Sequence, residues 1–152
     1  DYEYFSDTLT EVCISLAQDL VRDGEGATKF IEIIVTGAAD NAAAKNIASS
    51  VAKSQLCKTA FYGQDANWGR IACAAGYSGS SFDPDNLDLH IQGIHVLAKG
   101  QPTGYSETEI QGLMKKTEIQ VALSLCEGSG TATFWTSDLS LEYVTINADY
   151  RT

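Results

Sequence analysis

The sequence has few basic side chains for its acidic content. Ten lysines and arginines stand against 20 aspartates and glutamates among 152 residues, which gives a net charge of -10. A surface of that sign repels phosphate backbones and anionic lipids, so nucleic acid is not an expected partner. Long apolar runs are also missing, and a membrane helix needs about 20 such residues in succession. The hydrophobic fraction of 44% is ordinary for a globular protein. We therefore expect a single folded domain over residues 1–152, with no membrane segment.

Cysteine and histidine are scarce as well. The four cysteines are far apart, in apolar surroundings, at Cys13, Cys57, Cys73 and Cys126. Without zinc or redox spacing, they are predicted to be reduced thiols in the core. His90 and His95 have no further ligand at metal-binding spacing, so no metal site is predicted. No serine or cysteine lies in a glycine-framed turn beside a histidine, which argues against a catalytic triad. Residues 1–4 resemble neither a signal nor a transit peptide, and the start looks like mid-protein sequence.

Hydrophobic periodicity predicts the helices and strands. A Thr8/Glu11 capping box followed by helical spacing predicts a helix over Thr8–Val21. Further helices are expected after Asp40 or Asn41, over the small residues 71–76, and after the Ser106/Glu109 capping box. The predicted strands are 30–36, 56–62, 119–125, 131–135 and 143–146, with a bent strand or hairpin around Gly93 over 87–97. The order favours an α+β fold (mixed α/β layers), with helices packed on a mainly antiparallel sheet.

Two polar loops are candidate sites. In the segment 22–30, Glu25 stands between Gly24 and Gly26, where a tight loop could bring its carboxylate close to a ligand. A solvated polar turn is the simpler interpretation of the same spacing. The segment lacks the Gly-Lys-Ser/Thr ending of a phosphate loop and precedes a strand, which excludes nucleotide binding there. The second loop, 63–70, lies between the predicted strand 56–62 and the predicted helix 71–76.

Four motifs resemble one known family. They are Arg22-Asp23-Gly24-Glu25-Gly26-Ala27-Thr28-Lys29, Asp65-Ala66-Asn67-Trp68-Gly69-Arg70, Thr136-Ser137-Asp138-Leu139 and Ile146-Asn147-Ala148-Asp149-Tyr150-Arg151-Thr152. In this order, with the last at the carboxy terminus, they resemble ornithine acetyltransferase, the bifunctional glutamate N-acetyltransferase of arginine biosynthesis. The resemblance spans essentially the whole chain.

The resemblance implies an acetyl transfer from N-acetylornithine to glutamate through an acyl-threonine intermediate. Members of this family cut themselves at an Ala-Thr bond, and the freed threonine is the nucleophile. Neither Ala27-Thr28 nor Ala132-Thr133 lies in the Met-containing context of the family's cleavage junction, so this chain resembles the C-terminal part of a β chain, with no catalytic residue of its own. The family's substrate contacts correspond to Glu25, Asn147 and Thr152. Asp65, Asn67 and Arg70 are expected to act mainly as supporting or structural groups.

The resemblance also implies partners and a location. The partners are the α chain and the N-terminal part of the β chain of the same precursor, in a hetero-oligomer. No cofactor is expected, and acetyl-CoA remains open as a co-substrate. The segment 56–60 looks fungal in style, which would place the protein in the mitochondrial matrix, whereas a bacterial source would place it in the cytoplasm. A non-catalytic amino-acid-binding α+β module is the alternative.

Overall fold

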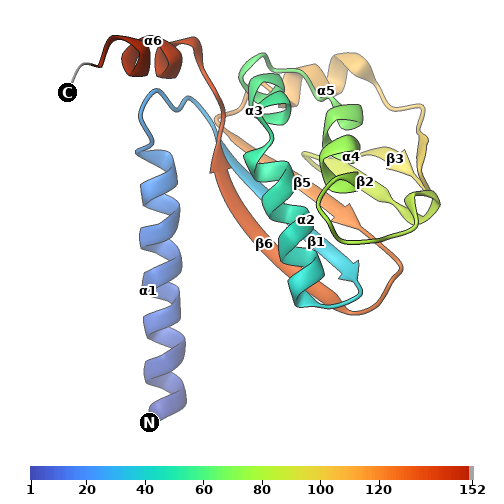
Figure 1. Ribbon diagram of the computed structural model, residues 1–152, viewed down its shortest axis with the longest axis horizontal. Helices are drawn as coiled ribbons and strands as arrows, with labels where there is room; N and C mark the ends of the chain where they lie inside the picture. The colour runs from blue at the N-terminus through green and yellow to red at the C-terminus, as the bar shows by residue number, and fades with distance from the viewer. Residues whose placement is uncertain (151–152) are drawn as a thin grey trace.

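The computed structural model describes residues 1–150, and one mixed sheet organises them (Figure 1). The helices are α1 (Tyr2–Arg22), α2 (Asn41–Lys53), α3 (Gln55–Tyr62), α4 (Trp68–Gly76), α5 (Glu107–Leu113), α6 (Leu141–Asp149) and a short 3₁₀ helix, η1 (Pro84–Asn86). The strands are β1 (Phe30–Ala38), β2 (Asp88–Ile91), β3 (Ile94–Ala98), β4 (Gln101–Pro102), β5 (Glu118–Ser124) and β6 (Gly130–Ser137).

The strand order is β4-β3-β2-β5-β1-β6. Only β1 and β5 run parallel, and the other four neighbouring pairs are antiparallel. The prediction of helices on a mainly antiparallel sheet is therefore confirmed.

The core lies between one face of the sheet and α2. On β1, Ile31, Ile33 and Val35 are fully buried, because alternate side chains of a strand point to the same face. Helix α2 begins at the predicted cap, where the Asp40 side chain accepts a hydrogen bond from the Ala43 amide at 2.7 Å. Its apolar stripe, Ala44, Ile47, Ala48 and Val51, is buried. Figure 1 shows α2 lying across β1 and β6.

Two segments predicted as strands are helices. Residues 55–62 form α3, in which Cys57, Ala60 and Phe61 recur at helical spacing and are buried. The Ser54 side chain caps this helix by accepting from the Cys57 amide. The β-branched segment 143–146 lies inside α6, where Ser140 is the cap and accepts from the Tyr143 amide at 3.1 Å. In both segments a serine cap outweighs weak strand propensity.

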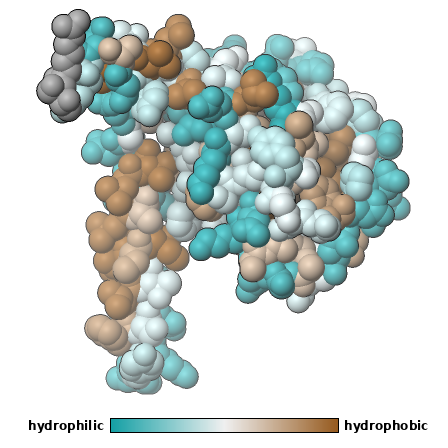
Figure 2. Space-filling view, viewed as in Figure 1, coloured by the Kyte–Doolittle hydropathy of each residue, from teal (hydrophilic) through white to brown (hydrophobic). Residues whose placement is uncertain are grey.

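Helix α1 is longer than predicted and stands apart from the core. It begins at Tyr2, so the Thr8/Glu11 pair lies inside it and caps nothing. The Thr8 hydroxyl instead donates to the Tyr4 carbonyl at 2.8 Å. Its apolar side chains stay in solvent: Leu9 and Val12 are 50% exposed, Leu16 59% and Leu20 77%. Figure 2 shows apolar side chains gathered along this helix.

The predicted hairpin around Gly93 is present. Strands β2 and β3 are joined by Gln92 and Gly93, which both have positive φ, at 53° and 80°. Two such residues are typical of a type I′ hairpin turn.

Candidate functional site

The loop that carries Glu25 is held in a defined conformation between α1 and β1. The Ala27 amide donates to the Gly24 carbonyl at 2.9 Å, which closes a tight turn around Glu25. Gly26 has a φ of 66°, and a Cβ added there would lie 2.7 Å from the Tyr143 backbone nitrogen. Glycine is therefore required on both counts, conformation and space, and the loop is more than a freely solvated turn.

Asp138 fixes the end of this loop that leads into β1. Its carboxylate accepts from the Thr28 amide at 2.8 Å, from the Lys29 amide at 2.9 Å and from the Thr28 hydroxyl. Asp138 is only 4% exposed, so these hydrogen bonds are shielded from water.

Ser140 connects the same loop to α6. Its hydroxyl donates to the Gly26 carbonyl at 2.6 Å and accepts from the Tyr143 amide, so one oxygen both caps α6 and anchors the loop. The loop and the start of α6 are thus fixed relative to each other.

Two of the three predicted substrate-binding residues are in contact. The Asn147 side-chain amide donates to the Glu25 carboxylate at 2.8 Å and to the Tyr143 carbonyl at 2.9 Å. Because both contacts use the amide nitrogen, the Asn147 side-chain oxygen is left to accept from a ligand. The third residue, Thr152, lies outside the described residues.

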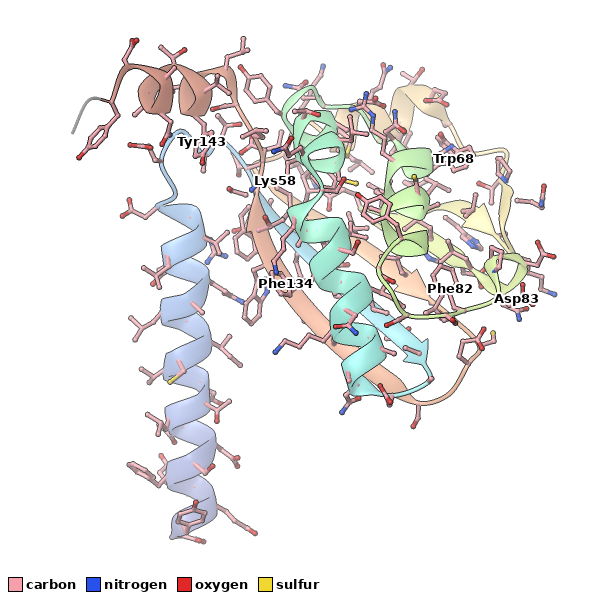
Figure 3. The ribbon with its side chains drawn as sticks, viewed as in Figure 1. Lys58, Trp68, Phe82, Asp83, Phe134 and Tyr143 are labelled. Atoms are coloured by element: carbon pink, nitrogen blue, oxygen red, sulfur yellow. The ribbon has the colours of Figure 1, made fainter. Side chains whose placement is uncertain are left out.

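A pocket of about 390 Å³ opens beside Glu25. Its lining residues come from the Glu25 loop, α2, α3, β6, the segment leading into α6 and α6 itself: Gly24, Glu25, Ala52, Lys53, Gln55, Lys58, Phe134, Thr136, Ser137, Asp138, Leu139 and Tyr143. Figure 3 shows Lys58, Phe134 and Tyr143 on three separate elements. The pocket combines two carboxylates, two ammonium groups and two aromatic rings, and the buried Asp138 carboxylate is engaged by Thr28 and Lys29, so Glu25 is the carboxylate open to a ligand. Such a lining suits a small ligand with charges of both signs.

Sequence reasoning missed Lys58 because its segment was interpreted as a strand. The signal was nonetheless present. Ser54 followed by apolar residues at helical spacing is typical of a capped helix, and such a helix places Lys58 at the edge of the face formed by Cys57 and Phe61. Burial lowers the pKa of Lys58, and the nearby Asp138 carboxylate opposes that shift.

A hollow of about 600 Å³ lies elsewhere, on the sheet face opposite α2. Both carboxylates that line it are already engaged. Arg22 pairs with Glu118 at 3.1 Å, and Glu32 accepts from Trp135 at 3.2 Å and from Gln120 at 3.0 Å. With both carboxylates bound to the protein in this way, this hollow is a weaker candidate for a ligand site than the pocket beside Glu25.

The second polar loop has a structural role in the described chain. The Asn67 side chain caps α4 by accepting from the Arg70 amide, and it donates to Asp65. The Arg70 guanidinium donates to the Leu56 carbonyl at 2.9 Å, and this hydrogen bond links α4 to α3. None of these three residues lines the pocket beside Glu25.

The prediction of four buried cysteines is wrong for three of them. All four are free thiols in the structure, but only Cys57 is buried, whereas Cys13, Cys73 and Cys126 are exposed. Cys13 was assigned to the core because α1 is amphipathic, yet α1 lies away from the core.

The histidines lie on the β2–β3 hairpin. The His90 and His95 rings stack with centroids 4.1 Å apart, and His95 lies 3.5 Å from an Asp88 carboxylate oxygen. In residues 1–150, no group of three or more His, Cys, Asp or Glu side chains is arranged to hold a metal ion. Over the same residues, no helix is both long and apolar enough to cross a bilayer.

Comparison with known proteins matches the whole chain to one family. The model of the ArgJ family covers residues 1–152. The arginine biosynthesis bifunctional protein ArgJ of Geobacter sulfurreducens is 50% identical over 149 residues, which are 97% of this chain and 38% of that protein. The protein of the same name from Halalkalibacterium halodurans is 45% identical over 153 residues, covering 100% of this chain and 37% of the relative.

A solved structure agrees with the fold. The crystal structure of arginine biosynthesis bifunctional protein ArgJ from Bacillus halodurans superimposes with a TM-score of 0.96 at 44% identity, over 99% of this chain and 71% of that chain. The present chain spans less than two fifths of the length of the curated relatives described above. With a family model that matches every residue and a fold shared along its length, the chain belongs to the ArgJ family.

Proposed function

We propose that this chain is the C-terminal part of the β chain of an ornithine acetyltransferase, and that it supplies the substrate-binding residues Glu25, Asn147 and Thr152. The observation that carries the proposal is the hydrogen bond between Asn147 and Glu25 beside a pocket of mixed charge. Two motifs 122 positions apart in the sequence meet there. The names of the relatives, arginine biosynthesis bifunctional proteins, support the same reading.

The reaction has two acyl transfers. A threonine in the preceding segment of the β chain takes acetyl from N-acetylornithine and releases ornithine, and glutamate then accepts the acetyl group. Splitting the transfer in this way replaces one difficult step by two easier ones. The chain itself then contributes binding and orientation, with no catalytic residue. The reaction needs no cofactor, and acetyl-CoA would enter only as a second acetyl donor.

Glu25 and Asn147 have distinct tasks in this proposal. The Glu25 carboxylate accepts a charged hydrogen bond from the ornithine ammonium. Asn147 orients that carboxylate through its amide nitrogen and offers its oxygen to an N–H of the substrate. The Asn147 amide nitrogen is not offered to the substrate, because it already makes two hydrogen bonds to protein acceptors.

The proposed partners are the α chain and the N-terminal part of the β chain. The exposed apolar side chains of α1 support this, because surfaces of that kind mark protein interfaces. The curated relatives are longer than this chain, and their additional length would correspond to these two partner segments. The relatives described above are bacterial, which supports a bacterial cytoplasmic location over the mitochondrial matrix.

The test is Glu25→Gln in the complete precursor. The substitution keeps the shape but removes the charge, and a charged hydrogen bond contributes about 1.5 to 3 kcal/mol. The KM for N-acetylornithine should therefore rise about 10- to 100-fold. Self-cleavage and the urea midpoint should stay at wild-type values, because Glu25 is exposed and packs little.

Steady-state kinetics and gel analysis of the processed chains provide the readout. Unchanged KM and turnover would make Glu25 a solvated turn residue. Loss of folding or of self-cleavage would give it a structural role instead, and either result contradicts the proposal.

A further inference from the structure

Lys58 is placed by α3 so that its ammonium group faces the pocket beside Glu25. The helix is anchored by buried Cys57 and Phe61 on one side. The Lys58 carbonyl accepts from the Leu139 amide at 3.2 Å, which ties α3 to the segment that leads into α6. The Lys58 side chain is half-buried and lines the pocket together with Glu25.

The ammonium group of Lys58 has few partners for a half-buried charge. Its one hydrogen bond in the described chain is a long one, 3.4 Å to the Thr136 hydroxyl. The ion pairs among residues 1–150 involve other residues, and no carboxylate lies within 4.0 Å of the Lys58 nitrogen. An ammonium group has three donors, so most of the donor capacity of Lys58 is unused.

Lys29 is an instructive contrast. It is 8% exposed, and its ammonium donates to the Met114 carbonyl at 2.9 Å and to the Lys116 carbonyl at 2.8 Å. Those two short bonds hold the side chain in a structural role. The Lys58 ammonium, by comparison, lies at the surface of a pocket, and in the described chain it has one long hydrogen bond in place of two short ones.

We propose that Lys58 binds the carboxylate of the amino-acid substrate, while Glu25 in the same pocket binds its ammonium. This inference rests on the proposed function and adds the group that recognises the substrate's anionic end. Asn147 does not take that task, because its amide nitrogen donates to two protein acceptors, the Glu25 carboxylate and the Tyr143 carbonyl. N-acetylornithine carries a carboxylate and, because its α-nitrogen is acylated, one ammonium at the end of its side chain. A pocket lined by the Glu25 carboxylate and by a Lys58 ammonium with unused donors matches that pattern.

The experiment compares two acetyl donors in the complete precursor. N-acetylputrescine is N-acetylornithine without its carboxylate, so wild-type enzyme should use it with a kcat/KM about 10- to 100-fold lower, the size of one charged hydrogen bond. In Lys58→Met the kcat/KM for N-acetylornithine should fall by a similar factor, mainly through KM. The value for N-acetylputrescine should hardly change, so the preference for the carboxylate should disappear.

Three further variants control the test. Lys58→Arg keeps the charge and should recover much of the preference. Lys58→Gln keeps a polar contact to Thr136 without the charge, and it replaces Lys58→Met if that variant folds poorly. Lys45→Met removes an exposed lysine of α2 that does not line the pocket and should behave as wild type.

The outcomes separate the inference from the function on which it rests. If Lys58→Met and Lys58→Gln keep the full preference for N-acetylornithine, or lose activity equally on both donors, Lys58 does not bind the carboxylate. The proposed function stands in that case. If the wild-type enzyme transfers no acetyl group from N-acetylornithine, the proposed function fails, and the inference about Lys58 fails with it.

Discussion

Asp138 is the single side chain that most directly fixes the position of the Glu25 loop. It is buried, and it accepts from three donors of Thr28 and Lys29 at the start of β1. Its negative charge also stabilises the protonated forms of Lys29 and Lys58, whose pKa values burial lowers. The Asp138 carboxylate therefore has two effects. It holds the backbone of the loop by hydrogen bonds, and it favours the positive charge of Lys58 in the pocket.

Asp138→Ala should destabilise the chain strongly, because it leaves buried donors without acceptors. An unsatisfied buried donor costs about 1 to 3 kcal/mol, so the loss should be about 3 kcal/mol or more. Urea unfolding followed by circular dichroism measures this.

Asp40→Ala is the matched control, since Asp40 is an exposed aspartate that caps α2 through one hydrogen bond. Its loss should cost about 1 kcal/mol. Equal effects of the two substitutions would show that Asp138 is no more than an ordinary cap.

At the scale of elements, the sequence predicted best where side-chain spacing and local caps agree. The strand at 30–36, the cap at Asp40 and the hairpin at Gly93 are all present. Residues 56–62 and 143–146 were mistaken for strands because short apolar runs fit both structures, and the serines at 54 and 140 were overlooked.

The candidate site residues came from two sources. Glu25 stood out by its glycine-flanked loop, the substrate-binding role of Glu25 and Asn147 came from the family resemblance, and the structure brings the two side chains into contact. Lys58 was missed, because its place beside Glu25 depends on how α3 is held against the segment after β6, where the Leu139 amide donates to the Lys58 carbonyl. Packing between distant segments is a property that local spacing does not contain.

The β2–β3 hairpin should make stability depend on pH. Burial and the neighbouring His95 lower the pKa of His90, and Asp88 opposes the shift. The unfolded chain, with an ordinary histidine pKa of about 6.5, then binds more protons than the folded one. The free energy of unfolding should therefore fall as the pH drops below about 6.5 toward the lower pKa of the folded state.

The measurement is urea unfolding between about pH 7.5 and pH 5 for wild type and His90→Gln. The substitution removes the titrating group, so its curve should be flatter over this range. Parallel curves for the two proteins would show that the hairpin has no part in the pH dependence.

At the scale of the whole molecule, α1 is the helix that stands apart from the core, and none of its residues is buried. Its apolar residues project from a helix that touches the rest of the fold chiefly at β6 (Figures 1 and 2). The chain, which matches less than two fifths of the length of its curated relatives, thus presents an exposed apolar face along α1.

The purified chain alone should show no acetyl transfer, because in our proposal the nucleophilic threonine belongs to another segment. Adding the α chain and the remainder of the β chain should restore turnover of N-acetylornithine. It should also slow hydrogen exchange in α1, since covered helices open less often. Both can be followed on the same samples, by product analysis and by mass spectrometry.

Two results would contradict this prediction. Appreciable turnover by the chain alone would show that the threonine is not needed. Restored turnover without added protection in α1 would move the interface to another part of the surface.

The position of β1 in the sheet also constrains how the protein is made. Ile33 on this strand pairs with Val121 on one side and Phe134 on the other, and both partners are synthesised long after it. While the ribosome is still translating the intervening residues, the most apolar strand of the sheet therefore has two unpaired edges. Such long-range pairing slows folding and exposes nascent chains to aggregation. Newly made chains should accordingly need protection until β5 and β6 have emerged.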